Sequence, residues 1–177
     1  MEVKSVLKKV LVYIVSLCVL YILQTALFPF LELGGIVPNL LLVLTVFYGF
    51  MRNTREGMIA GFFCGIVLDL STGLLFGVHA LALLFIGALN GLLRLIFYSD
   101  DVKLPIVFTA ISDIIYGLFM FTFFFLPRGS NHFEYYFFHL ILPEAVYSMV
   151  MAFFLYFIFY KIFDRLNHEE RKVEHIL

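Results

Sequence analysis

Six apolar runs, separated by short polar or glycine- and proline-bearing breaks, make up most of the sequence. In hydrocarbon the backbone must satisfy its own hydrogen bonds, and all six runs are predicted to be helical because a helix does so within one segment. The composition agrees, since 63% of the residues are hydrophobic and only 14% are charged. We predict an all-α polytopic membrane protein with one compact six-helix bundle at 1–163 and a cytoplasmic tail at 164–177. The expected spans are about 10–30, 36–51, 57–75, 78–97, 104–126 and 137–160.

The first two runs each leave an alternative. The first follows a basic segment, as a secretory signal does, but it is longer than a signal's apolar region and lacks a small-residue cleavage pattern, so a retained span is predicted. The second is about 24 Å long at 1.5 Å per residue, shorter than the ~30 Å hydrocarbon layer. It is therefore expected to be partly re-entrant or to lie deep in the bundle, and five spans is the alternative count.

The basic residues give the chain an orientation. With the N-terminus inside, eleven of the twelve Lys and Arg residues are cytoplasmic and only Arg128 lies outside. The positive-inside rule therefore favours six spans with both termini in the cytoplasm. The net charge of −1 gives no reason to expect nucleic acid as a partner. The cytoplasmic set is Lys4, Lys8, Lys9, Arg52, Arg55, Arg94, Lys103, Lys161, Arg165, Arg171 and Lys172.

The stretch 57–91 carries seven of the twelve glycines. Most of them are four residues apart, which places them on one helix face. Small residues on one face let helix backbones approach closely in lipid, so these glycines are predicted to be helix-packing positions. The spacing leaves open whether the partner helix belongs to this chain or to another. The glycines are Gly57, Gly61, Gly65, Gly73, Gly77, Gly87 and Gly91.

A second set of candidates consists of polar residues inside the apolar runs. An ionisable group at the centre of a membrane helix costs about 2.5 to 3.5 kcal/mol, so each should face the bundle interior. We treat the set as a candidate intramembrane polar or partner site. Its members are Asn39, Asp69, Asn90, Arg94, Asp113 and Glu144.

Depth along the spans suggests two groupings. Asp113 lies near the level of Asn90, with Arg94 one turn away, and these predict a polar lock in the inner half. Asp69 and Glu144 lie at similar depth in the outer half, where with Asn39 they could line a pocket and share a proton. The favoured reading of Asp69 is structural, namely that its carboxylate bonds the backbone around 71–72 where the helix ends.

The sequence offers no catalytic or metal-binding constellation. Cys18 and Cys64 lie inside apolar runs, which excludes a disulfide framework or a zinc-ligand spacing. His79 has no second ligand at a suitable spacing, and neither a G-x-S-x-G elbow nor a H-E-x-x-H motif occurs. We expect a non-enzymatic protein without cofactor or metal.

Two segments carry a family resemblance. PNLLLVLTVFYGFMRN and GFFCGIVLDLSTGLLFGVHALA, together with six short spans, resemble the bacterial rod shape-determining MreD family. The resemblance covers most of the chain and is strongest at 38–82. Its motif residues here are Pro38, Asn39, Gly65, Asp69, Gly73 and Gly77.

The resemblance implies a scaffold of the cell-wall elongation complex in the bacterial inner membrane, needed for rod shape and for regulation of peptidoglycan synthesis. The implied partners are membrane lipid, an MreC-like protein and, through it, RodA, its transpeptidase partner and MreB filaments. The family also resembles, in fold, the substrate-binding membrane subunits of energy-coupling-factor transporters. The alternative function is therefore a small-molecule-binding subunit of such a transporter.

Overall fold

The computed structural model describes residues 2–32, 34–73, 75–97, 103–124 and 133–174. Within these ranges the chain forms six continuous helical segments and no β-strand. Several segments combine α-helix with a wider π turn or a tighter 3₁₀ turn, labelled η. The elements are α1 (Glu2–Ile22) with η1 (Leu23–Leu27) and η2 (Phe28–Leu31), α2 (Leu40–Phe47) with η3 (Tyr48–Arg52), α3 (Thr54–Thr72), α4 (Val78–Ile96), α5 (Lys103–Phe124), and α6 (Phe133–Tyr136) with η5 (Phe137–Ile141) and α7 (Leu142–Glu174).

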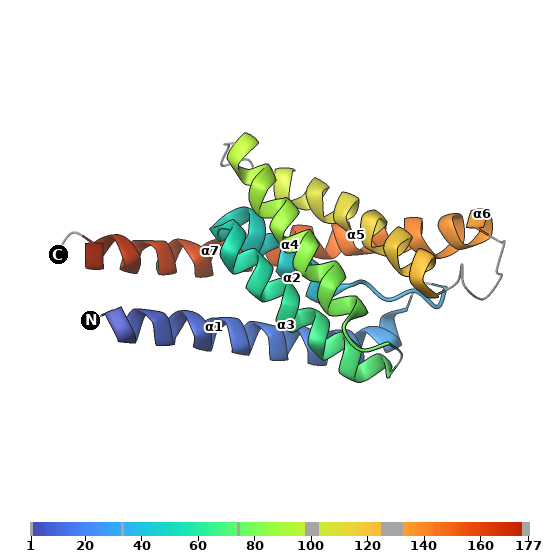
Figure 1. Cartoon of the computed structure of the whole chain (residues 1–177), viewed down its shortest axis with the longest axis horizontal. Coiled ribbons are helices and arrows are strands. Elements are labelled where there is room, and N and C mark those ends of the chain that lie inside the picture. Colours follow the sequence, from blue (N-terminus) through green and yellow to red (C-terminus); the bar gives the residue numbers. More distant parts are fainter. Residues whose placement is uncertain (1, 33, 74, 98–102, 125–132, 175–177) are drawn as a thin grey trace.

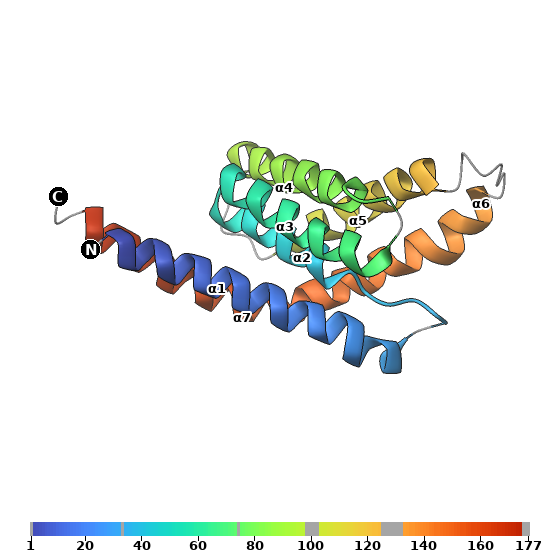
Figure 2. The ribbon, with the colours of Figure 1, turned by 60° about the horizontal axis from the view of Figure 1, so that its bottom comes forward.

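Successive segments run back and forth along the long axis of the molecule (Figures 1 and 2). The beginning of α1 and the end of α7 therefore lie at the same end of the molecule, as an even number of passes requires. α3 and α4 form an antiparallel pair on one side of the bundle, and α2 lies in its interior (Figure 2). All eight residues of α2 are buried, which confirms the expectation that the second run lies deep in the bundle.

The second helix begins later than the sequence predicted. The expected span started at 36, but the helix starts at Leu40, and residues 36–39 are not helical. Pro38 explains the delay, because the residue before a proline is pushed toward extended backbone. Asn39 then caps the helix, since its side-chain oxygen accepts a hydrogen bond from the Leu42 N–H at 3.2 Å.

Four of the six helical segments are long and apolar enough to cross a membrane. They are Leu7–Leu31, Val78–Ile96, Lys103–Phe124 and Phe133–Leu166. Leu40–Arg52 is apolar but shorter, and α3 is not among the four. α3 starts with Thr54, Arg55 and Glu56 and ends with polar residues, which leaves a short apolar middle. The structure thus supports a helical membrane protein, and crossing by all six segments remains a prediction.

The last helix is much longer than a membrane span. It runs without interruption over 133–174, about 63 Å at 1.5 Å per residue, about twice the hydrocarbon thickness. The helix therefore continues beyond the predicted span 137–160 and through most of the predicted tail at 164–177. Phe163 and Leu166 in this extension are buried, and the Phe163 ring contacts Tyr48 of η3 at 4.9 Å between centroids. The extension therefore packs on the end of the second helical segment. The last two residues of the predicted span 104–126 lie outside the described residues.

Candidate functional site

The glycines of α3 and α4 form a seam in which the two backbones touch. A Cβ built on Gly61 would overlap the Leu83 carbonyl, and one on Gly65 would overlap the backbone of Ala80. Gly57 and Gly87 face each other, since a Cβ on either would meet the backbone of the other. These atoms are backbone atoms and cannot turn aside as a side chain could. The glycine seam therefore packs within this chain, which answers the question that the spacing left open.

Two further glycines complete the seam at its end near the α2–α3 turn. A Cβ on Gly91 would overlap Thr54 at the start of α3. Gly49 in η3 was missed by the sequence analysis, which looked only within 57–91. Its added Cβ would lie 2.7 Å from the Gly87 carbonyl oxygen, so three helical segments converge here. The only signal for Gly49 in the sequence was a small residue within an apolar run of large ones.

Gly73 and Gly77 shape the turn at the end of α3, as their place in the sequence indicated, and are not packing positions of the seam. They were expected to be packing positions, but a Cβ added to either would meet no atom within 4 Å. Their backbone is left-handed instead, with φ of 62° at Gly73 and 99° at Gly77. Gly73 ends α3 and Gly77 begins α4, so both make the turn between the paired helices. Glycine is required because other residues adopt positive φ only with strain.

Asp69 holds the start of α4 onto the end of α3. Its carboxylate accepts hydrogen bonds from the backbone N–H groups of Gly77 at 2.9 Å, His79 at 3.1 Å and Ala80 at 3.1 Å. The first N–H groups of a helix lack partners within the helix, and the helix dipole favours negative charge there. The favoured structural reading of Asp69 was therefore right in kind, but the backbone that it bonds belongs to α4 rather than to 71–72.

The structure brings a tyrosine of α5 near both Asp69 and Glu144, the two residues expected to line a pocket. Tyr116 of α5 lies within electrostatic range of both carboxyl groups and near the Asn39 side chain. Its hydroxyl is 2.7 Å from Nδ1 of His79, whose ring stacks on an aromatic ring of α5. Because three N–H groups already bind the Asp69 carboxylate, proton sharing with Glu144 has no support in this geometry.

The predicted lock around Asp113 is wrong in its contacts. The Asn90 amide donates to Ser112 Oγ at 2.8 Å and to the Ile86 carbonyl at 2.9 Å. Neither carboxylate oxygen of Asp113 has a hydrogen-bond partner within the described part of the chain, so Asn90 and Arg94 do not bind it. Adjacent helical residues point about 100° apart. With Ser112 directed at α4, Asp113 turns toward α7 instead.

On the α7 side, Asp113 meets Glu144 and Ser148. Ser148 is held from the second helical segment, because the Asn39 N–H donates to Ser148 Oγ at 3.0 Å. The Asp113 and Glu144 carboxyl groups interact electrostatically. The structure thus replaces the predicted partner of Glu144, Asp69, by Asp113. Depth along the helices had grouped Glu144 with Asp69 in the outer half and placed Asp113 in the inner half, but depth does not report which neighbouring helix a side chain faces.

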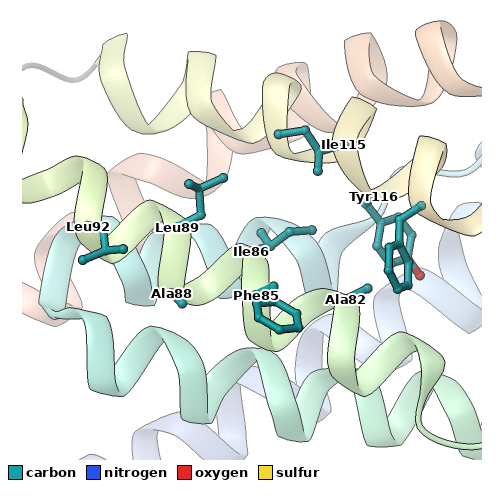
Figure 3. A pocket seen from close by; sticks show the side chains of 9 residues that line it. Ala82, Phe85, Ile86, Ala88, Leu89, Leu92, Ile115 and Tyr116 are labelled. Carbon is teal, nitrogen blue, oxygen red and sulfur yellow. The ribbon is translucent and has the colours of Figure 1, made fainter.

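A lateral groove lies between α4 and α5, and Tyr116 is one of its lining residues. It has a volume of about 380 Å³ and its lining is almost entirely apolar. Ala82, Phe85 and Leu89 of α4 face Ile115 and Phe119 of α5 across it (Figure 3 labels all but the last). Among the described residues, no group of three or more His, Cys, Asp or Glu side chains is placed to hold a metal ion.

Comparison with known proteins identifies a family. The family model for the rod shape-determining protein MreD matches residues 5–166, nearly the whole chain. Searches of curated proteins and of solved structures returned no significant match, so the expected likeness to energy-coupling-factor transporter subunits stays an expectation. The family match spans the glycine seam, the Asp69 cap and the Asp113–Glu144 pair, and the chain belongs to the MreD family of rod shape-determining membrane proteins.

Proposed function

We propose that the protein is a non-enzymatic scaffold of the bacterial cell-wall elongation complex, which supports rod shape and regulates peptidoglycan synthesis. The observation that carries this proposal is the family match over 5–166. Its setting is the inner membrane, crossed by six helical segments with both termini in the cytoplasm. The even number of passes along the bundle and the lopsided placement of Lys and Arg support this orientation.

The polar groups of the bundle support a structural role rather than a catalytic one. The Asp69 carboxylate is used to bind N–H groups of α4, and the Asn90 amide is used to join α4 to α5. A scaffold needs a core that holds its shape, and the glycine seam supplies one. What such a protein then offers to partners is its outer surface.

The outer surface of α1 is the best candidate for contact with partner helices. Between residues 7 and 31 only Leu20 and Phe28 are buried, and apolar side chains such as Leu11 and Val15 are more than half exposed. Tyr13 ties α1 to α3, since its hydroxyl donates to the Ala60 carbonyl at 3.0 Å. We propose that an MreC-like membrane protein binds here, within lipid. RodA, its transpeptidase partner and MreB filaments would join through it.

Co-purification from membranes tests this proposal. The tagged full chain would be expressed in a rod-shaped bacterium, extracted in mild detergent and its partners identified by mass spectrometry. Recovery of an MreC-like protein, reduced by polar substitution at Leu11 and Val15 but not at an equally exposed position of α4 such as Leu81, is expected. Recovery of a transporter coupling subunit without an MreC-like protein would overturn the proposal and favour the binding-subunit alternative.

A further inference from the structure

Asp113 is the least satisfied polar side chain of the bundle core. It is only 2% exposed, and neither of its carboxylate oxygens has a hydrogen-bond partner among the described residues. Burying an ionised carboxylate without a partner is very costly. An apolar residue at this position of a membrane helix would avoid that cost. Such a group in a membrane protein therefore points to a function.

Glu144 directly follows an irregular stretch of the last helix. Pro143 cannot donate a backbone hydrogen bond, and its ring would clash with the carbonyl four residues earlier in a regular helix. The wider π turn η5 immediately before Leu142 accommodates it, and such turns are frequent at functional sites. The Glu144 carboxyl group, one helical turn before Ser148 on the same face of α7, interacts electrostatically with the Asp113 carboxyl group of α5, the helix that packs on α7.

Neutral oxygen atoms complete the surroundings of this pair. The Ser148 hydroxyl is fully buried beside the Asp113 carboxylate, although it forms no hydrogen bond of good geometry with it. Ser148 Oγ already accepts the N–H of Asn39, so it is held in place from α2. One hydroxyl oxygen and two carboxyl groups thus form one interacting cluster between α5 and α7.

No positive side chain balances the pair. Neither carboxylate forms a salt bridge with a Lys, Arg or His side chain within the ranges that the structure describes. The titratable groups that face the pair are Tyr116 of α5 and Tyr136 of α6. Asp69 of α3 and His79 of α4 interact with Tyr116. These groups add no positive charge from a Lys or Arg. Two negative charges at close range in low dielectric would repel strongly.

We propose that Asp113 and Glu144 form a binding site for one small monovalent cation, a proton or a sodium ion, with the Ser148 hydroxyl as a third oxygen. The bound cation joins α5 to α7 by cancelling the repulsion between the two carboxyl groups. Carboxylate and hydroxyl oxygens are ligands that hard cations prefer. This inference does not depend on the proposed scaffold function.

Thermal unfolding of the purified full chain in detergent tests the site. A ligand that binds only the folded state at about 100 times its Kd should raise the Tm by about 5 to 10 °C. One arm lowers the pH from 8 to 5 in choline chloride, without sodium. The other adds sodium chloride at pH 8 against choline chloride at the same ionic strength. A rise in the first arm alone identifies the proton as the ligand, and a rise in the second identifies sodium.

Three variants show whether the response comes from this site. Asp113→Asn and Glu144→Gln should each lose most of the Tm response, and the double variant should lose all of it. Glu134→Gln, an exposed glutamate on the same helical segment, is the matched control and should respond as the wild type does. Equal responses in the wild type and the double variant, or no response in either arm, would overturn the proposal.

Infrared difference spectroscopy of the unmodified protein gives a readout that does not need the variants to fold. If a proton is bound, the carbonyl band of a protonated carboxyl group should be present at pH 7 and disappear as pH rises. If sodium is bound, adding sodium should shift the carboxylate bands, whereas choline should not. Spectra without a protonated carboxyl band and without a sodium-specific shift would refute the site.

Discussion

Gly61→Ala is the sharpest test of the glycine seam. The added Cβ would overlap the Leu83 carbonyl oxygen and lie 2.5 Å from its carbonyl carbon and 3.0 Å from the Leu84 nitrogen. All three are backbone atoms, so α3 and α4 must move apart. Alanine favours a helix over glycine by about 1 kcal/mol, whereas overpacking of this kind costs about 3 kcal/mol. The net effect is a loss of about 2 kcal/mol in unfolding free energy.

Thermal unfolding of the full chain in detergent measures this loss. For a chain of this size, 2 kcal/mol lowers the Tm by about 4 to 8 °C. Gly117→Ala is the matched control, because the three atoms nearest to its Cβ belong to the Ile141 side chain, at 2.9 to 3.3 Å, and not to a backbone. Ile141 is buried and stiff, but a small shift of one side chain costs less than separating two backbones, so this variant should lose less stability than Gly61→Ala. Wild-type stability in Gly61→Ala, or a larger loss in Gly117→Ala, would refute the seam.

Three other substitutions test the rest of the α3–α5 packing. Asp69→Asn weakens charge-assisted hydrogen bonds to the first turn of α4, so we expect a loss of about 2 kcal/mol in unfolding free energy. Amide hydrogen exchange should become faster, at first only in that turn, and unchanged exchange would contradict the cap. Asn90→Ala and Ser112→Ala should be coupled by about 0.6 to 1 kcal/mol in a double-mutant cycle of unfolding free energies, and additive losses would mean that their bond contributes nothing. Gly77→Ala should cost about 1 kcal/mol through its positive φ, whereas Gly77→Asn, which tolerates that backbone better, should cost less in the same thermal assay.

The glycine spacing was informative because it needs only the geometry of one helix. Residues four apart share a face, so Gly57, Gly61 and Gly65 could be placed on a contact surface from the sequence. The same spacing misled at Gly73 and Gly77, since the period continues past the point where the helix ends. Whether a helix persists depends on its termini, which a spacing of glycines does not report.

The polar groups show a second limit. Depth along each helix could be counted, and it correctly brought Asn90 near the level of the polar residues in the middle of α5. The rotation of each helix about its own axis could not be derived from the sequence. A rotation by one residue, about 100°, exchanges Asp113 for Ser112 as the partner of Asn90. Likewise Asp69 was correctly assigned a backbone role, but its partners come from the next helix and depend on how the turn closes.

Cell shape is the most direct measurement of the central claim, that this chain acts in rod-shape determination through a rigidly packed membrane core. A rod-shaped bacterium depleted of its own MreD would express the wild-type chain, Gly61→Ala or Gly117→Ala, with membrane levels matched by immunoblot. The account predicts rods with the wild type and with Gly117→Ala, and shorter or rounded cells with Gly61→Ala. Rounded cells with the wild-type chain at normal membrane levels would contradict it.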